Sequence, residues 1–339
     1  MKKFTKSLIA MAMAATMAVC AGSLTGCSNN DGDGELSGTI TVYMPSPAGL
    51  ADKLAEGFTA KTGVKVEQFQ GTTGEILARL EAEKTNPQAD VVILASWSDG
   101  LSLKEEDKLL SYQSENADKM HEGMVDSDYM LYGSSASAVG VIYNTDKYPT
   151  LNADWTELAG ETYKGDLAIP DPTKSGACKD FCAGLVTAFE NGSGIIDSLA
   201  LNGMINGGAN KAALSTVKQG SKNILVAGVD YNAYSDINKG EHINIYYPKS
   251  GTIINPRPAM IMKTAPHVEN AKAFIDYLLS DEAQNLVGDA YLLPGRSDIT
   301  TTKHTNVSDI PTFTTDWSKM MGAATVTAQY VVNACKGNK

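Results

Sequence analysis

Residues 90–95 read Asp-Val-Val-Ile-Leu-Ala, a run in which almost every side chain is apolar. A strand buried on both faces has such a continuous run, whereas a strand with one wet face alternates apolar and polar residues. Two other extended segments, Thr39 to Met44 and Val64 to Phe69, precede it, and a helical pattern separates each strand from the next. This order predicts an α/β fold with a parallel sheet and right-handed crossovers.

The two helical patterns carry boundary signals. Apolar residues recur at helical spacing from Leu50 to Phe58, Ser46 is placed to cap that helix, and Gly63 is placed to end it. Thr72 and Glu75 form the pattern of a capping box at the start of the second helix. Both helices are therefore expected to begin just after a strand.

The rest of the chain repeats the mixed pattern. Ala138 to Tyr143 and Ile253 to Met262 are extended segments, and the stretch between them alternates helical and strand-like runs. Val268 to Leu279 is a strongly amphipathic helix. No internal repeat is visible, which argues against a solenoid.

The amino-terminal segment has the order of a secretory signal peptide, predicted for residues 1–26. Lys2, Lys3 and Lys6 precede an uncharged apolar run, and Leu24-Thr25-Gly26-Cys27 follows it. The last four residues resemble the bacterial lipobox, which implies lipidation of Cys27 and a membrane anchor. The alternatives are an ordinary Cys27 near a cleavage site, or a retained membrane helix, for which the run is short. The polar residues 28–38 predict a flexible tether.

Composition excludes several classes of protein. Loss of three lysines and no acidic residue with the signal peptide takes the formal charge from −11 to −14, which argues against a nucleic-acid partner. Cys178 and Cys182 lie four apart on a predicted helix and are interpreted as buried small hydrophobes; with Cys335 they leave an odd number, not a disulfide framework. The four histidines have no metal-ligand spacing. No metal and no other cofactor is therefore expected.

Eight segments, in the same order along the chain, resemble a known family. They are Thr41 to Tyr43, Gly71 to Leu80, Pro87 to Val92, Trp155 to Leu158, Tyr163 to Pro172, Lys174 to Ala177, Tyr247 to Thr252 and Ala271 to Ser280. Together they resemble the type 2 periplasmic-binding proteins of ABC importers, from the branch that includes ferric-ion, sugar-phosphate, phosphoglycerate and phosphonate binders.

The resemblance implies two α/β lobes with a ligand cleft between them. Residues 39–137 and 255–310 would form lobe one, and residues 138–254 and 311–339 lobe two. The extended segments Ala138 to Tyr143 and Ile253 to Met262 would cross between the lobes, so that closure on a ligand is a hinge motion.

The ferric-binding branch uses a histidine after the first strand, a glutamate after the third and a tyrosine pair in lobe two. The matching places here hold Pro45-Ser46-Pro47, Ala95-Ser96-Trp97 and Asp230-Tyr231-Asn232-Ala233-Tyr234, and the adjacent pair Tyr246-Tyr247 aligns poorly. Ferric-ion binding is therefore the second hypothesis.

The remaining residues favour an anion, and a small phosphorylated or phosphonate organic anion is the first hypothesis. Thr72, Thr73 and Gly74 begin one helix, and Ser175, Gly176 and Ala177 begin another. Helix starts offer free N–H groups and a positive dipole end, which attract an anion even on an acidic protein. Both hydroxyls could instead only cap their helices; for Ser175 the resemblance implies ligand contact. The other residues expected along the cleft are Ser46, Ser96, Trp97, Ser134, Ser135, Asp230, Tyr231 and Tyr234. For Trp97, Tyr231 and Tyr234, core packing is the competing interpretation.

The sequence thus predicts a monomeric, lipid-anchored capture subunit of an ABC importer, at the outer face of the cytoplasmic membrane or in the periplasm, with permease subunits as partners. The motifs of common hydrolases, P-loop proteins and dinucleotide-binding proteins are missing, so an enzyme is not expected. A carboxylate-dependent extracellular hydrolase and a ligand-sensing lipoprotein are the alternatives from other classes.

Overall fold

The computed structural model describes residues 36–47 and 49–338; the predicted signal peptide, Cys27 and most of the tether lie outside these ranges. The strands are β1 Thr39–Met44, β2 Lys65–Gln70, β3 Val91–Ile93, β4 Leu109–Leu110, β5 Tyr132–Asn144, β6 Leu167–Ile169, β7 Ile205–Asn206, β8 Ile224–Val229, β9 Ile243–Tyr246, β10 Ile254–Met262 and β11 Leu293–Pro294. The α-helices are α1 Leu50–Thr62, α2 Thr73–Ala82, α3 Trp97–Glu105, α4 Gly176–Ala188, α5 Gly192–Leu201, α6 Asn210–Lys218, α7 Asp230–Ile237, α8 Val268–Leu278, α9 Asp281–Asp289 and α10 Trp317–Ala334. Four short 3-10 helices cover Ala117–Lys119, Glu157–Ala159, Glu161–Tyr163 and Val307–Asp309.

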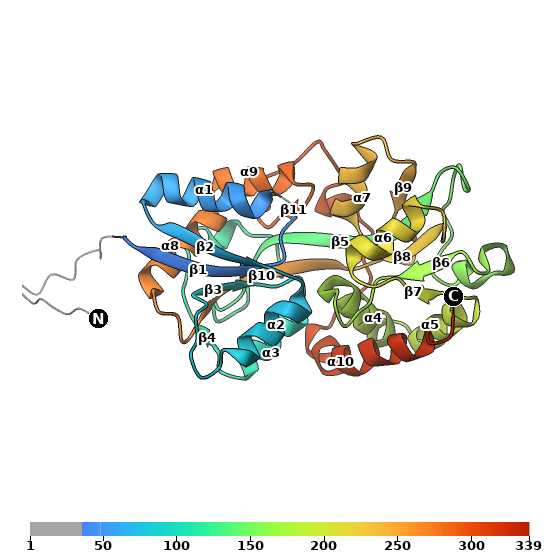
Figure 1. Ribbon diagram of the computed structural model, residues 1–339, viewed down its shortest axis with the longest axis horizontal. Helices are drawn as coiled ribbons and strands as arrows, with labels where there is room; N and C mark the ends of the chain where they lie inside the picture. Colours follow the sequence, from blue (N-terminus) through green and yellow to red (C-terminus); the bar gives the residue numbers. More distant parts are fainter. Residues whose placement is uncertain (1–35, 48, 339) are drawn as a thin grey trace, which may run out of the picture. The chain divides into compact units, whose positions relative to one another are not determined.

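One part, called lobe one here, is built on strands β2, β1, β3 and β10 in that order. The first three are parallel, and β10 runs antiparallel to β3. Helices α1 and α9 cover one face of this sheet, and α2 and α3 cover the other (Figure 1). Phe58 of α1 meets Phe274 of α8 edge to face, with ring centroids 5.0 Å apart, inside the larger apolar cluster of the lobe.

The other part, called lobe two, continues the sheet through β5, β8, β6 and β7. Its main core lies where α4 packs on the sheet and α10 packs on α4, with Trp155 and Phe181 at 4.7 Å between ring centroids. Cys178, Cys182 and Cys335 are buried free thiols in this core, which confirms the interpretation of the first two as small hydrophobes.

Strands β5 and β10 join the lobes and lie side by side in the middle of the described body (Figure 1). Tyr132 at the start of β5 belongs to the core of lobe one, whereas Val139 and Val141 belong to the core of lobe two. All thirteen residues of β5 are buried. The sequence predicted only its second half, because small residues such as Ser134 to Ser137 carry no apolar pattern.

Two of the predicted helix boundaries are correct and one is wrong. The capping box is confirmed: Thr72 Oγ1 accepts from the Glu75 N–H at 3.3 Å, and Glu75 Oε2 accepts from the Thr72 N–H at 2.7 Å. Gly63 ends α1 with φ of 78°, as expected. The expectation that Ser46 caps α1 is wrong, because Gly49 occupies the cap position and Ser46 precedes a proline, which disfavours helical geometry. Within the described ranges, no helix has both the length and the apolar character needed to span a membrane.

Candidate functional site

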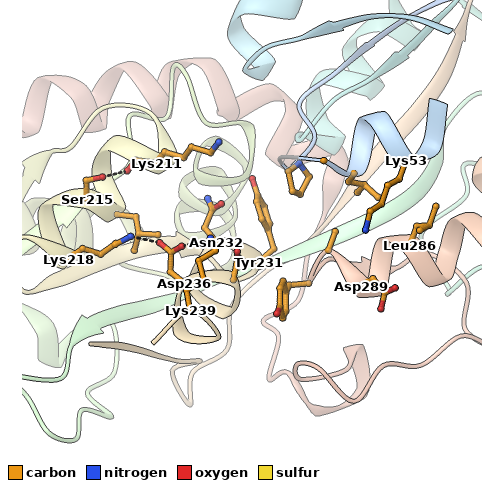
Figure 2. A pocket seen from close by; sticks show the side chains of 17 residues that line it. Lys53, Lys211, Ser215, Lys218, Tyr231, Asn232, Asp236, Lys239, Leu286 and Asp289 are labelled. Carbon is orange, nitrogen blue, oxygen red and sulfur yellow. Dashed lines mark hydrogen bonds and ion pairs between the residues drawn. The ribbon is translucent and has the colours of Figure 1, made fainter. Parts of the chain in front are cut away.

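Two adjoining cavities lie between the lobes. The smaller has a volume of about 310 Å³ and the larger about 550 Å³, and each is large enough for a small organic molecule. Both are lined by Pro47, Lys211, Tyr231 and Asn232, so they form one continuous cleft. Figure 2 shows the larger cavity, with Lys53, Leu286 and Asp289 of lobe one facing α6 and α7 of lobe two.

The wall of the smaller cavity contains a buried arginine. Arg257, in the crossing strand β10, is only 2% exposed. Its Nη2 donates to the carbonyl oxygen of Pro45, and its guanidinium carbon lies 5.8 Å from the centre of the Tyr231 ring. Among the described residues, no carboxylate forms an ion pair with it at 4.0 Å or less. Since an unpaired buried charge is unfavourable, this cation is poised for an anionic partner.

The carboxylate that acts electrostatically on Arg257 is that of Asp230, and it is hydrogen-bonded to other groups. Asp230 is buried and accepts from the N–H of Ala138 at 3.0 Å and from its neighbour Tyr231 at 2.8 Å. Burial raises the pKa of Asp230 to about 7. Near neutral pH it is therefore only partly ionised and is an incomplete counterion. Burial lowers the pKa of Arg257, but a guanidinium stays protonated in proteins.

Helix starts from both lobes meet at the same cavity. Thr72 and Thr73 begin α2 in lobe one, and Ser175 and Gly176 begin α4 in lobe two. Ser175 is 3% exposed, and its hydroxyl caps α4 by accepting from the Cys178 N–H at 3.2 Å. The cavity thus combines hydroxyl groups, two positive helix ends and a buried guanidinium, all of which are groups that can bind an anion.

Two glycines allow the lobes to approach each other beside this cavity. A Cβ atom on Gly74 would lie 2.8 Å from the carbonyl oxygen of Thr173 in lobe two. A Cβ on Gly176 would lie 2.5 Å from the carbonyl oxygen of Ala95 in lobe one. Any larger residue at either place would push backbone segments of the two lobes apart.

The described lining of the whole cleft carries six cationic side chains and three carboxylates. The cations are Lys53, Lys174, Lys211, Lys218, Lys239 and Arg257, and the carboxylates are Glu75, Asp236 and Asp289. Each carboxylate is already bound: Glu75 in its capping box, Asp236 to Lys218 and Lys239, and Asp289 to Lys303. The cleft is therefore locally positive in a chain whose formal charge is −11.

A second polar contact joins the lobes away from the two cavities. Asp180 of α4 accepts from the N–H of Trp97 at 2.8 Å and from the hydroxyls of Ser96, at 3.1 Å, and Ser98. Beside it, Lys179 forms an ion pair with Asp99 of α3. A carboxylate of lobe two thus caps a helix of lobe one.

The residues that the sequence predicted for the site fall into two groups: some line the cavities and others do not. Ser46, Thr72, Thr73, Ser175, Gly176 and Tyr231 line the smaller cavity. Gly74 lies beside it, in contact with Thr173. The structure places the others outside both linings: Ser96, Trp97, Ser134, Ser135, Ala177, Asp230 and Tyr234.

These displaced residues have structural partners instead. Trp97 is 3% exposed and packs against Trp317 with 6.4 Å between ring centroids, so core packing is the better interpretation. Ser96 binds Asp180, and Ala177 packs in the core of lobe two. The hydroxyl of Tyr234 lies 2.9 Å from that of Thr305. Ser134 and Ser135 are buried within β5.

Sequence reasoning missed the charged residues of the cleft. Arg257 carried a usable signal, because it is the single charged residue in the apolar run Ile253 to Met262. A charge inside a strand that is expected to be buried indicates either an ion pair or a ligand. Lys53, Lys174 and Lys211 carried no such signal, since solvent-exposed lysines are common on helices and loops.

Metal-binding groups do not gather in the described part of the chain. No group of three or more histidine, cysteine, aspartate or glutamate side chains there is arranged so that it could hold a metal ion. Of the lobe-two tyrosines considered above, Tyr231 lines the cleft, whereas Tyr234 and Tyr247 hydrogen-bond to each other at 3.2 Å.

Comparison with known proteins relates the chain to solute-binding proteins. A family model described as bacterial extracellular solute-binding protein matches residues 86–320. A putative 2-aminoethylphosphonate-binding periplasmic protein of Salmonella paratyphi A is 26% identical over 258 residues, which cover 72% of this chain and 74% of that protein. Iron uptake protein A1 of Synechocystis sp. is 26% identical over 264 residues, 72% of each chain.

Solved structures show the same fold. The periplasmic binding protein AfuA from Actinobacillus pleuropneumoniae, with fructose-6-phosphate bound, matches with a TM-score of 0.78 at 20% identity, covering 88% of this chain and 97% of that one. Iron-bound HitA from Pseudomonas aeruginosa matches with a TM-score of 0.76 at 19% identity, covering 86% of this chain and 99% of that one.

Proposed function

The chain belongs to the bacterial extracellular solute-binding proteins, the binding subunits of ABC importers, and we propose that its solute is a small phosphorylated or phosphonate organic anion. Its role is to bind a solute outside the cytoplasm rather than to catalyse a reaction. The predicted fold class, two-lobe α/β of the type 2 periplasmic-binding kind, is confirmed by the structural matches.

The observation that carries the choice of ligand is Arg257. A guanidinium presents paired donors that match the oxygens of a phosphate or phosphonate group. Here it is buried, lacks a carboxylate partner among the described residues, and faces the cavity that Thr72 and Ser175 also line. In our proposal the anionic head lies between Arg257 and the starts of α2 and α4.

Ligand capture uses both lobes in this proposal. Lobe one, residues 39–137 and 255–310, supplies Arg257 and α2, and lobe two, residues 138–254 and 311–339, supplies α4. Because the anion binds groups from both sides, it favours the closed arrangement through its extra contacts there.

Ferric ion is the less favoured solute. Hard Fe³⁺ requires several anionic oxygen ligands. The carboxylates that line the cleft are engaged with other groups, and a buried guanidinium would repel a cation. Because one relative is named for iron uptake, the test below also includes ferric ion.

The test is titration calorimetry of the purified protein with an alkylphosphonate, a sugar phosphate, inorganic phosphate and ferric citrate. Arg257→Gln should weaken binding of the organic anions at least about tenfold, since a hydrogen bond to a charged group contributes ~1.5–3 kcal/mol. Thermal stability of the empty variant should hold or rise, because a buried unpaired charge has been removed. Unchanged affinity in the variant, or tight binding of ferric ion alone, would contradict the proposal.

A further inference from the structure

The larger cavity extends the cleft beyond the proposed phosphate site. It shares four lining residues with the smaller cavity, so a ligand held at Arg257 can reach into it. Lys53 of α1 enters it from lobe one, and Lys211 at the start of α6 enters it from lobe two (Figure 2). The two lysines therefore face the same space from opposite sides.

These two lysines differ from the others in the larger cavity. Lys218 is bound to Asp236 at 2.8 Å and Glu241 at 2.7 Å, and Lys239 is bound to Asp236 at 3.0 Å. Within the described ranges, neither Lys53 nor Lys211 has an acidic partner within 4.0 Å. Their ammonium groups are available to a ligand.

The same lining lacks a place for a positively charged ligand group. Its two carboxylates among the described residues, Asp236 and Asp289, both form ion pairs with lysines. The Tyr231 ring is the aromatic face that a ligand ammonium would contact, but the Arg257 guanidinium already lies 5.8 Å from its centre. An ammonium in this cavity would meet free lysines and no free carboxylate among the described residues.

We infer that the ligand carries a second anionic group at the end away from its phosphate or phosphonate, and that Lys53 and Lys211 select it. This inference rests on the proposed anion site at Arg257. The cleft then discriminates against aminoalkyl phosphonates, although a relative that is 26% identical is named for 2-aminoethylphosphonate.

Three probes of nearly equal size isolate the charge at the far end. They are 3-phosphonopropionate, propylphosphonate and 2-aminoethylphosphonate, whose far ends are anionic, neutral and cationic. Exposed charge pairs contribute ~0.2–1 kcal/mol, or about 1.4- to fivefold for each lysine. We expect 3-phosphonopropionate to bind about tenfold or more tightly than 2-aminoethylphosphonate at low salt, with propylphosphonate between them. The preference should shrink as ionic strength rises.

Variants assign the preference to the two lysines. Lys53→Gln and Lys211→Gln should each weaken binding of 3-phosphonopropionate about 1.4- to fivefold, leave binding of propylphosphonate nearly unchanged and slightly strengthen binding of 2-aminoethylphosphonate. These opposite changes cannot result from a general loss of structure. Lys61→Gln is the matched control, since Lys61 lies in the last turn of the same helix as Lys53 and outside both linings.

The outcomes separate the two proposals. If 2-aminoethylphosphonate binds as tightly as 3-phosphonopropionate, or if both lysine variants match the control, the second anionic group is wrong while the anion site at Arg257 stands. If none of the three phosphonates binds the parent protein, the anion site itself is wrong and the inference fails with it.

Discussion

Asp180, like Asp230, has an environment unlike that of an ordinary aspartate. It is fully buried in α4, yet its carboxylate receives hydrogen bonds from the start of α3 in the other lobe. Burial, with a smaller effect of the nearby Asp99 carboxylate, raises the pKa of Asp180 to about 7. The contact that holds α3 against α4 therefore changes its charge near neutral pH.

This shift predicts a dependence of stability on pH. Between pH of about 4 and about 7, the folded protein retains a proton at Asp180 that the unfolded chain releases. This proton's contribution to the unfolding free energy is complete below about pH 4 and is lost as the pH rises toward 7. The unfolding free energy falls by at most ~1.4 kcal/mol per pH unit over this range. Asp180→Asn should make the fall in unfolding free energy shallower, as measured by urea denaturation across this range.

The control for this experiment is Asp118→Asn, which removes the same charge from an exposed residue. It should leave the slope unchanged. If Asp180→Asn keeps the parent's slope, the carboxylate of Asp180 titrates at an ordinary pKa in the folded protein.

At the residue scale, the sequence predicted the hydroxyl groups of the site better than its charges. Thr72, Thr73 and Ser175 were identifiable because caps and helix starts follow local rules. Arg257 and Lys211 line the same cavity only because β10 and α6, distant in the chain, face one cleft. A single sequence does not state which lysines share a cavity, so this part of the site could not be predicted.

At the scale of the element, α4 offers the sharpest test of an anion-binding helix start. Ser175→Asp keeps a side chain that can cap the helix, and a negative charge there favours the helix by ~0.3–1 kcal/mol. Thermal stability should therefore hold or rise. Binding of an alkylphosphonate should nevertheless fall by more than about tenfold, because the carboxylate repels the anionic head.

Ser175→Ala is the companion variant. It removes the cap, so it should lower stability by ~1 kcal/mol, and it weakens binding without adding a charge. Should Ser175→Asp bind the phosphonate as well as the parent, Ser175 is only a cap and the anion lies elsewhere in the cleft.

Several elements with a strong apolar pattern were predicted almost residue by residue, but the predicted strand Asp90 to Ala95 extends only over Val91–Ile93. The predicted β1, Thr39 to Met44, has the observed bounds, and Ile253 to Met262 is within one residue of β10. The first half of β5 was missed because burial there depends on tertiary packing of small residues. The cap of α1 was misplaced because prolines around Ser46 delay the helix to Leu50.

At the scale of the whole molecule, the two-lobe fold was predicted from the family resemblance, whereas periodicity alone gave only an α/β class. The crossing of the lobes depends on the long-range pairing of β5 with β10, in which Ile254 lies opposite Ala138. The residue boundaries proposed for the lobes stay predictions, as does the lipid anchor, which lies outside the described residues.

The anchor has a direct test. Cys27→Ser should move the protein from the membrane fraction to the soluble fraction, because it removes the predicted site of lipidation. Several acyl chains at ~0.8 kcal/mol for each buried methylene would otherwise hold the protein firmly. A variant that stays in membranes with an uncleaved amino terminus would show that the apolar run itself is the anchor.

The buried thiols of lobe two have a practical consequence. Cys178, Cys182 and Cys335 are at most 4% exposed, and burial raises the pKa of the Cys335 thiol to about 11. Alkylating dyes react with exposed thiolates, so these three should remain unlabelled in the native protein. A cysteine introduced at the rim of the cleft, for example at Ser235, would then be the only readily labelled thiol of the described body. With a fluorophore there, closure of the lobes would change the emission, and the protein would become a reagentless optical sensor for its own solute.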